Sequence, residues 1–216
     1  MSFQIKDLPY AQFEQLGMSR KDVITMPPQE LADLLNGHRS GLISLKIDLG
    51  QGMQPILTQA KLSLMRNPDN TLSLGVYPIL AKPENTIEAT AEQWTKMLKG
   101  EPIVKDSRAF NGTIEPHIHQ LDKDTNEILS ARVSAIHIPN SVNNSPLTPT
   151  QKEQLRKGEP IEIKGKSTKE SIVVRLDLNE TKGFKTVTGE QARELLQEIK
   201  PSLDTTQATI SRGVKM

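Results

Sequence analysis

Apolar and polar residues alternate along several short stretches of this chain, and stretches with helical spacing lie between them. Residues 43–49 place Ile or Leu at every second position, and residues 60–64 and 72–76 alternate in the same way on either side of Asn67-Pro-Asp-Asn70. Alternation with a period of two is typical of strands that bury one face, and a turn sequence between two such strands predicts a hairpin. The pattern therefore predicts antiparallel strands separated by short helices.

One of the helical stretches occurs twice. Residues 90–103 read TAEQWTKMLKGEPI and residues 148–161 read TPTQKEQLRKGEPI, and these segments are identical at 7 of 14 positions. Unrelated segments of this length share far fewer residues. Similarity at a fixed offset indicates that the chain repeats one structural unit.

The residues shared by the two segments are those that begin and end helices. A T-x-x-Q sequence opens each copy, at Thr90 and Thr148, and predicts a capping box that satisfies the first free N–H groups. Pro149 suits the first helical position. Gly100 and Gly158 fall where a left-handed residue ends a helix. We therefore expect each copy to start with a short, well-capped helix.

A strand–turn–strand pattern follows each helix, in residues 114–139 and 171–187, and the Leu-Asp pairs at 121–122 and 176–177 align once three residues are removed. A more diverged copy precedes them, with its helix in residues 27–37. A fourth T-x-x-Q helix begins at Thr188 and either caps the end of the repeats or starts another one. Residues 201–216 are expected to fray. The predicted organisation is N-terminal helices with a diverged first repeat in 1–80, a second repeat in 81–140, a third in 141–188, and a terminal helix and tail in 189–216.

These elements predict an α+β fold of tandem small units, each a short helix packed on a mostly antiparallel hairpin or three-stranded sheet. Units this small bury little apolar surface alone, so neighbouring units should dock. The expected core residues are Trp94, Met97, Leu98, Ile103, Leu121 and Val133 in the second repeat, and Leu155, Ile161, Val173, Leu176 and Phe184 in the third.

Composition narrows the possible functions. The chain has 27 basic and 26 acidic residues and a net charge of +1, so no whole-chain field attracts nucleic acid or anionic membranes. It contains no cysteine, which excludes disulfides, thiolate zinc sites and cysteine nucleophiles. No signal-peptide pattern and no apolar run long enough to span a bilayer is present. We therefore expect cytoplasmic localisation and no membrane partner.

Two motifs with possible chemistry are incomplete. Gly165-Lys-Ser-Thr168 resembles the end of a phosphate-binding loop, but Pro160 stands where that loop needs its first glycine. Asp122-Lys-Asp-Thr-Asn126 resembles the start of a calcium loop, but Glu127 and Val133 replace the required Gly and Glu. We interpret both as hairpin turns. Because no nucleophile elbow occurs either, we predict no catalytic residue, no small-molecule substrate and no cofactor.

His117 and His119 lie two residues apart, and hence on one face of a predicted strand. This spacing can begin a metal site, which needs at least three protein ligands. His137 and Asp122 are the candidates for a third ligand, and nothing in the sequence places them nearby. We expect two half-exposed strand histidines, with a metal site as the alternative.

Basic residues gather in the third repeat. Residues 146–188 contain nine Lys and Arg against six Asp and Glu, a net charge of +3. Such a face could contact phosphates, although Phe184 is the only aromatic there for stacking on bases. The candidate nucleic-acid-binding residues are Lys164, Lys166, Lys169, Arg175, Lys182 and Lys185.

The segments KDLPYAQFEQLGMSRKDV, LLNG and AKLSLMRNPDNTLSLGVYPI resemble the front half of a family of uncharacterised Bacteroidetes proteins. The segments LTPTQKEQLRKGEPIEIKG and VRLDLNETKGF resemble a second domain of unknown function that occurs in tandem in the same proteins. Together the two resemblances cover most of residues 6–188. Members are often encoded on conjugative or mobilisable elements, sometimes near DNA-processing domains. The resemblance implies a cytoplasmic role around element DNA or its machinery, and it supplies no catalytic residue.

The leading hypothesis is therefore a non-enzymatic binding or scaffolding module of a mobile genetic element, with an unknown protein partner or the DNA of that element. The alternative is a nucleic-acid-binding accessory protein that uses the basic third repeat. A metal protein or enzyme built around His117 and His119 is the third possibility.

Overall fold

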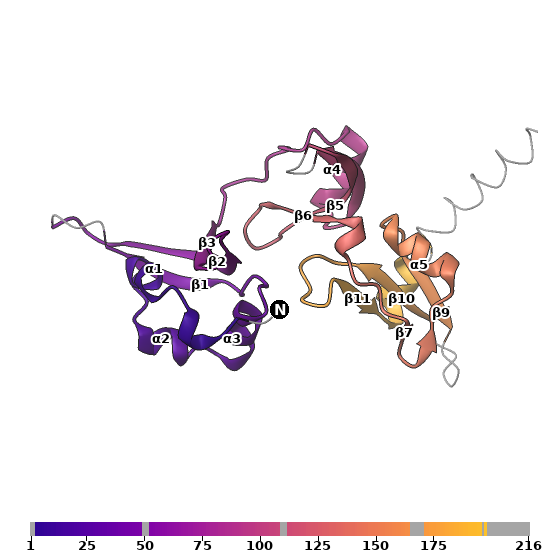
Figure 1. The fold of residues 1–216 in the computed structure, drawn as a ribbon. Helices are drawn as coiled ribbons and strands as arrows, with labels where there is room; N and C mark the ends of the chain where they lie inside the picture. Colours follow the sequence, from indigo (N-terminus) through magenta and orange to yellow (C-terminus); the bar gives the residue numbers. More distant parts are fainter. Residues whose placement is uncertain (1–2, 49–51, 109–111, 165–170, 196, 198–216) are drawn as a thin grey trace, which may run out of the picture. The chain divides into compact units, whose positions relative to one another are not determined.

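A computed structural model describes residues 3–48, 52–108, 112–164, 171–195 and 197, and the chain divides into two compact units. Unit 1 comprises Met1–Thr86 and Asp122–Ile128, and unit 2 comprises Ile87–Leu121 and Leu129–Met216. Short helices lie beside small antiparallel sheets in both units (Figure 1). The expected α+β class, built from small helix–sheet units, is confirmed.

Unit 1 packs four short helical segments against one sheet. The helical segments are η1 (Ile5–Asp7), α1 (Tyr10–Gln15), α2 (Arg20–Ile24) and α3 (Pro28–Leu35), and the strands are β1 (Ile43–Ile47), β2 (Ile56–Arg66) and β3 (Leu72–Pro78). β2 is the central strand and pairs antiparallel with both neighbours. Figure 1 shows the indigo helices gathered over one face of this sheet.

The core of unit 1 follows the predicted alternation. Leu45, Ala60, Leu62 and Leu64 are buried on the face that meets Phe13 and the other helix residues. Because adjacent strand residues point to opposite faces, Lys61 and Ser63 lie on the other face. The hairpin turn is at Asn67–Asn70 as predicted, where Asn70 has a positive φ of 70°.

Unit 2 contains two further helix–sheet modules with the same strand topology. The second module has α4 (Ala91–Leu98), β4 (Ile103–Arg108), β5 (Ile114–Leu121) and β6 (Ile128–Arg132), and the third has α5 (Pro149–Arg156), β9 (Ile161–Lys164), β10 (Ser171–Leu176) and β11 (Phe184–Val187). The segment between them forms η2 (Val133–Ala135) and the two-residue strands β7 (Ser141–Val142) and β8 (Ser145–Pro146). We call α3 with β1–β3 the first module.

The predicted helix signals are confirmed in both copies. The Thr90 and Thr148 side chains each accept a hydrogen bond from the backbone N–H of the Gln three residues later. The side chain of that Gln in turn accepts a hydrogen bond from the backbone N–H of the Thr. Pro149 is the first residue of α5. Gly100 and Gly158 end their helices at φ values of 79° and 78°, which suit glycine because it has no Cβ to clash.

Both faces of the second and third sheets are partly covered. Leu155 of α5 packs with Ile161, Val174 and Leu176 of its own sheet, and also with Ile118 of β5. Residues 189–195, which are helical, place Ala192 and Leu195 against Val173 and Val187 on the opposite face of the third sheet. We call this opposite face, which carries Val173, the back face.

Most of the predicted core residues are buried, with some exceptions. Leu98 was expected in the core and is 52% exposed. Met97 already occupies the inward position of α4, and the next helical residue is rotated by about 100°. Val76, which the alternation of β3 placed inward, is 40% exposed. Trp94, Val133 and Phe184 are half-buried. Leu49 and the predicted tail 201–216 lie outside the described residues.

Candidate docking sites for hairpin turns

The three sheets carry a polar residue at one equivalent position of their central strands. In each sheet the first residue of the opening strand is an isoleucine that pairs with a central-strand residue, in the pairs Ile43↔Ala60, Ile103↔His119 and Ile161↔Val174. The next residue on the central strand is Lys61, Gln120 or Arg175. Strand alternation turns these three side chains away from the face of the paired residue.

Lys61 holds the hairpin turn that begins at Asp122. Its Nζ donates to Asp122 Oδ1 at 2.9 Å and lies 2.8 Å from Asp124 Oδ2. The Asp122 side chain is 1% exposed and that of Lys61 is 9% exposed. The turn and the first residue of β6 (Asp122–Ile128) belong to unit 1, whereas β5 and the rest of β6 belong to unit 2. A buried ion pair of this kind fixes geometry, because either charge alone would be costly to bury.

Arg39 closes the same site from another side. Its Nη1 donates to Glu127 Oε2 at 2.9 Å and lies 3.5 Å from Asp122 Oδ2. Its guanidinium also stacks over the Tyr77 ring, 3.4 Å from the ring centroid. Tyr77 in turn shares a hydrogen bond of 3.0 Å with Ser63 on β2. The turn is therefore bound by two cationic side chains, Lys61 and Arg39, whose own positions are fixed by packing.

The site shifts the titration of both partners in the ion pair. Burial raises the pKa of Asp122, but the hydrogen bond and charge of Lys61, with backbone N–H groups of Asp124 and Thr125, outweigh it and hold that pKa below its usual range. Burial lowers the pKa of Lys61, but Asp124 and Asp122 outweigh it and raise that pKa above its usual range. Both groups are thus held in their charged forms.

The turn is also joined to unit 1 through the backbone. Leu80 donates its N–H to the Thr125 carbonyl at 2.9 Å, and Asn126 Nδ2 donates to the Leu80 carbonyl at 2.7 Å. Within the turn, Asp122 Oδ1 accepts the Asp124 N–H at 3.0 Å. The predicted hairpin turn at residues 122–126 is therefore correct, and its leading aspartate both shapes the turn and docks it.

Gln120, an uncharged side chain, holds the second turn by hydrogen bonds. Its Nε2 donates to Asp177 Oδ1 at 2.9 Å and to the Gly100 carbonyl at 3.0 Å, and its Oε1 accepts the Leu178 N–H at 2.6 Å. Asp177 also accepts the Asn179 N–H at 3.1 Å, as in the first turn. Gln120 is fully buried, so these three bonds satisfy most of its polar capacity. In both sites the leading aspartate of a hairpin meets the equivalent residue of an earlier sheet.

His117 and His119 share one face of β5, with ring centroids 6.0 Å apart. His119 was expected to be half-exposed, but it is 3% exposed, because its ring lies between two hydroxyls. Its Nε2 is 3.0 Å from Ser107 Oγ and its Nδ1 is 2.7 Å from Ser130 Oγ. Burial chiefly lowers its pKa, with the neighbouring His117 and Lys105 adding to the effect. Among the described residues no group of three His, Cys, Asp or Glu side chains could hold a metal ion.

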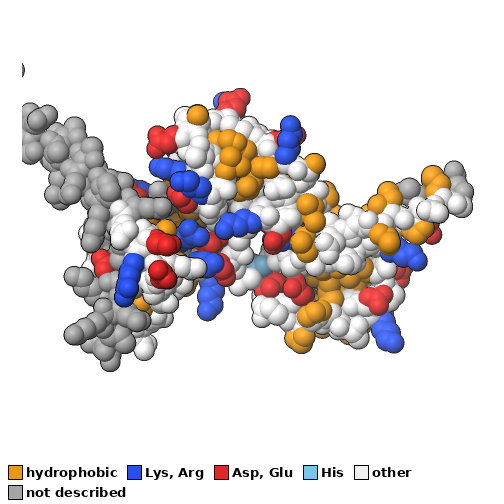
Figure 2. Space-filling model, turned by 180° about the vertical axis from the view of Figure 1, so that it is seen from behind, with side chains coloured by type: hydrophobic (Ala, Val, Ile, Leu, Met, Phe, Trp, Pro, Cys, Tyr) orange, Lys and Arg blue, Asp and Glu red, His pale blue; other side chains and the backbone are white. Residues whose placement is uncertain are grey.

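The candidate nucleic-acid-binding residues have different surroundings. Arg175 has a side chain only 16% exposed, with Nη2 3.8 Å from Asp177 Oδ2, and Lys185 lies 3.9 Å from Glu180. Lys182 is exposed in the turn after β10. Lys164 ends β9, and its side chain is outside the described residues, as are Lys166, Lys169 and the Gly165–Thr168 segment. Figure 2 shows basic and acidic side chains interspersed on the face in view.

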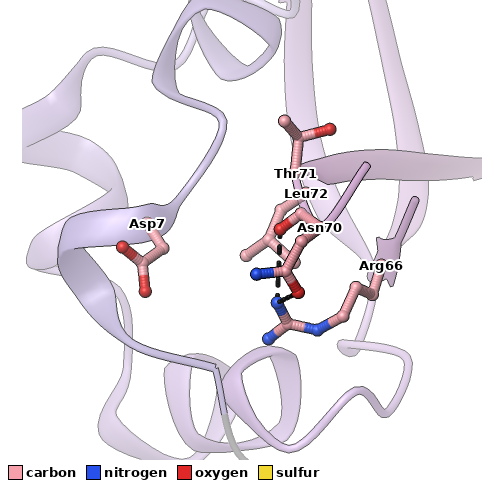
Figure 3. A pocket seen from close by; sticks show the side chains of 5 residues that line it. All are labelled: Asp7, Arg66, Asn70, Thr71 and Leu72. Carbon is pink, nitrogen blue, oxygen red and sulfur yellow. Dashed lines mark hydrogen bonds between the residues drawn. The ribbon is translucent and has the colours of Figure 1, made fainter. Parts of the chain in front are cut away.

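A shallow pocket in unit 1 does not add a chemical site. It is lined by Asp7, Arg66, Asn70, Thr71 and Leu72 (Figure 3). Arg66 Nη1 donates to Asn70 Oδ1 at 2.6 Å and to the Asn70 carbonyl at 3.2 Å. The guanidinium is thus occupied in bracing the turn of the first hairpin.

Sequence reasoning missed Arg39, Lys61 and Gln120. A lysine or glutamine on the polar side of an alternating strand carries no signal of burial, because the pattern predicts a solvent-facing position. The aligned Leu-Asp pairs at 121–122 and 176–177 were the one available signal for the docking aspartates.

Residues 3–88 match the model of a family described as "Protein of unknown function (DUF4099)". This match confirms, for the first two-fifths of the chain, the resemblance to an uncharacterised family. No curated protein and no solved structure matches the chain. In the part of the chain that the structure describes, no helix has the length and apolar character needed to cross a membrane.

Proposed function

We propose that this chain is a non-enzymatic binding or scaffolding module, organised as a tandem array of helix–hairpin repeats. The supporting observation is that buried polar side chains on the central strands bind the hairpin turn of the following sheet. Lys61 and Asp122 form one docking site, and Gln120 and Asp177 form another. His119 has a hydroxyl on each ring nitrogen. A general acid or base must reach its substrate, and groups engaged in this way serve architecture.

The surface that would meet a protein partner in this proposal is the start of β2 in unit 1. Leu57 is 77% exposed, Met53 52% and Ile56 47%. Ile56 and Leu57 are adjacent and therefore project from opposite faces of the strand. The three side chains therefore form no single patch, and Leu57, the most exposed of them, is the one that we place in the interaction site. A partner with a complementary apolar surface would cover Leu57.

The test is to crosslink the tagged full chain in cells, identify its partner, and measure the dissociation constant with the purified partner. Leu57→Ser should weaken binding about tenfold, the equivalent of losing one well-buried apolar contact. Ile114→Ser is the matched control, because Ile114 is 69% exposed on unit 2. Equal effects of the two substitutions, or the absence of any partner, would contradict the proposal.

Association with a mobile genetic element and a cytoplasmic location are part of the proposal and rest on the family resemblance. Crosslinking of the tagged chain in a cell that carries such an element should enrich element DNA or element-encoded proteins over chromosomal ones. Equal recovery of both would remove this part and leave the binding role standing.

A nucleic-acid-binding accessory is the second candidate, supported by the net charge of +3 over residues 146–188. Lys182 and Lys185 are its exposed contacts among the described residues, whereas Arg175 is largely buried beside Asp177. Binding of this kind should weaken steeply as salt rises. A filter-binding titration with duplex and single strands at low and moderate salt decides the matter, and absence of low-salt binding excludes it.

A further inference from the structure

The two docking sites hold their turns by different chemistry. In unit 1 the side chains that bind the turn are cations. Lys61 Nζ lies 2.9 Å from Asp122 Oδ1 and 2.8 Å from Asp124 Oδ2. Arg39 Nη1 donates to Glu127 Oε2 at 2.9 Å. The turn from Asp122 to Glu127 therefore presents three carboxylates to two cations, and we call it the acidic turn.

The turn held by unit 2 has an amide where the acidic turn has its second carboxylate. Asp122 and Asp177 each accept the N–H of the residue two positions later, at 3.0 and 3.1 Å. Asp124 and Asn179 are therefore equivalent. Asn179 Nδ2 donates to the Leu121 carbonyl at 3.2 Å and to Asp177 Oδ1 at 3.3 Å. A carboxylate at this position has no proton to donate to either oxygen.

The residues that close the two turns also differ. The Asp122 N–H donates to the Glu127 carbonyl at 2.8 Å, and the Asp177 N–H donates to the Gly183 carbonyl at 3.1 Å. Glu127 and Gly183 are therefore equivalent. The turn from Asp177 to Gly183, which we call the amide turn, thus has no side chain at the place where the acidic turn meets Arg39.

The central strands that receive the turns differ in the same sense. The Leu121 carbonyl, which follows Gln120, accepts from the amide turn. The equivalent Leu62 carbonyl, which follows Lys61, already accepts the Ser40 N–H at 2.8 Å. Gln120 Oε1 also accepts a backbone N–H of the amide turn at 2.6 Å, whereas lysine has no acceptor atom.

The two turns are therefore poor substitutes for each other. On Lys61, the amide turn would leave Arg39 without a carboxylate. On Gln120, the acidic turn would set the Asp124 carboxylate against a carbonyl oxygen, with a neutral side chain in place of a cation. Buried polar and charged groups without partners are costly, so each site favours its own turn and disfavours the other.

We propose that Lys61, Arg39 and Gln120 are specificity-determining residues that select by charge which hairpin turn docks on which sheet. Asp124 and Asn179 are the matching residues in the turns. The order of the modules then follows from side-chain chemistry as well as from chain connectivity. This inference rests on the array organisation of the proposed function and is independent of the partner that the array binds.

The test is a double-mutant cycle in the 216-residue chain, in which Asn179→Asp is made both in the parent and in Gln120→Lys. NMR hydrogen exchange of the Asp177 N–H, which donates to the Gly183 carbonyl, reports how firmly the amide turn is held. In the parent, Asn179→Asp should lower its protection about fivefold, because a donor is replaced by a second carboxylate. In Gln120→Lys the same change should raise protection about fivefold, because the new lysine gains the two carboxylates that Lys61 has.

Thr181→Asp is the matched control, because it adds the same charge at an exposed position of the amide turn. It should change protection by the same factor in the parent and in Gln120→Lys. An equal rescue of Gln120→Lys by Thr181→Asp would reveal a general charge effect and overturn the proposal. An effect of Asn179→Asp with the same sign in both chains would overturn it as well.

Unfolding of the single variant is also informative. If Gln120→Lys loses the dispersed amide signals of unit 2, their return on adding Asn179→Asp supports selection by charge. Continued unfolding of the double variant overturns it. Loss of partner binding in Leu57→Ser is measured separately, so failure of the proposed function and failure of this inference are distinguishable.

Unit 1 supplies the reciprocal cycle, with Asp124→Asn made in the parent and in Lys61→Gln. The reporter is the Leu80 N–H, which donates to the Thr125 carbonyl of the acidic turn at 2.9 Å. Asp124→Asn should lower its protection about threefold in the parent, a smaller factor because Asp124 is 56% exposed. In Lys61→Gln it should cause no loss, and an equal loss in both chains would contradict selection by charge.

Discussion

Lys61→Met is the substitution that most directly tests how the hairpin turn is held in unit 1. Methionine keeps the length and apolar stem of lysine, so packing along β2 should be preserved. The change leaves Asp122 buried at 1% exposure without its 2.9 Å partner. Removing one member of a buried ion pair costs about 3–5 kcal/mol, because the remaining charge stays uncompensated.

Three features of the site set where in this range the effect falls. Arg39 remains 3.5 Å from Asp122 Oδ2, and the Asp124 N–H still donates to Oδ1 at 3.0 Å. The second partner of Lys61, Asp124, is 56% exposed and contributes little. We therefore expect unit 1 to lose about 3 kcal/mol. Adding Asp122→Asn should restore most of that loss, because it removes the stranded charge and keeps the acceptor for the turn.

Native-state hydrogen exchange measures the loss of unfolding free energy in unit 1 alone, from the exchange of the β2 amides. One of these is the Leu62 N–H, which donates to Ser40 Oγ at 2.9 Å. Lys46→Met is the control, because Lys46 lies on β1 of the same sheet and is exposed. A loss below about 1 kcal/mol for Lys61→Met, or an equal loss in the double variant, would refute the view that the ion pair holds the turn.

The same pair predicts how the stability of unit 1 depends on pH. The pKa of Asp122 is depressed in the folded state, so its contribution is present above about 3.9 and is lost as the pH falls through the folded value. The pKa of Lys61 is raised, so its contribution is present below about 10.4 and is lost as the pH rises through the folded value. Lys61→Met should remove the alkaline loss, which urea titrations at a series of pH values would show.

Other predictions concern unit 2 and the helix ends. The pKa of the buried His119 is lowered in the folded state, so its contribution to the stability of unit 2 is present above about pH 6.5 and is lost as the pH falls toward the folded pKa. His119→Gln should remove this pH dependence in thermal melts. His137→Gln, at an exposed site, should leave it in place. Thr148→Ala should cost about 1 kcal/mol in urea unfolding because it removes the capping box of α5, and an unchanged midpoint would contradict this. Gly17→Ala should lower the free energy of unfolding by more than about 1 kcal/mol, because Gly17 has a φ of 77° and an added Cβ would collide with the Lys46 carbonyl. Thermal unfolding of the variant measures this loss. An unchanged melting temperature would be inconsistent with this backbone geometry.

Local patterns were enough to predict the elements of each module. The capping boxes at Thr90 and Thr148 and the helix-ending Gly100 and Gly158 are where the sequence places them. These features depend on residues within a few positions of one another, so the backbone chemistry alone specifies them. The exposure of Leu98 shows the limit of the method, because a leucine at the end of a short helix is oriented by the tertiary contacts of its neighbour Met97.

The docking sites lay beyond the reach of sequence reasoning. Lys61 and Asp122 are 61 positions apart, and Gln120 and Asp177 are 57 apart. Lys61 and Gln120 lie at the polar positions of alternating strands, and such positions ordinarily face water. What makes them buried is a turn supplied by a distant segment, which no local rule can place.

The sequence by itself determined the α+β class, the helix boundaries, the hairpins and the recurrence of a Leu-Asp pair at the head of two turns, since each follows from short-range spacing. The tertiary structure alone decided that those aspartates meet Lys61 and Gln120, and that Arg175 holds the same position with no such partner among the described residues. The physical reason is that burial of a charge depends on what packs over it, and strand register with long-range packing sets that.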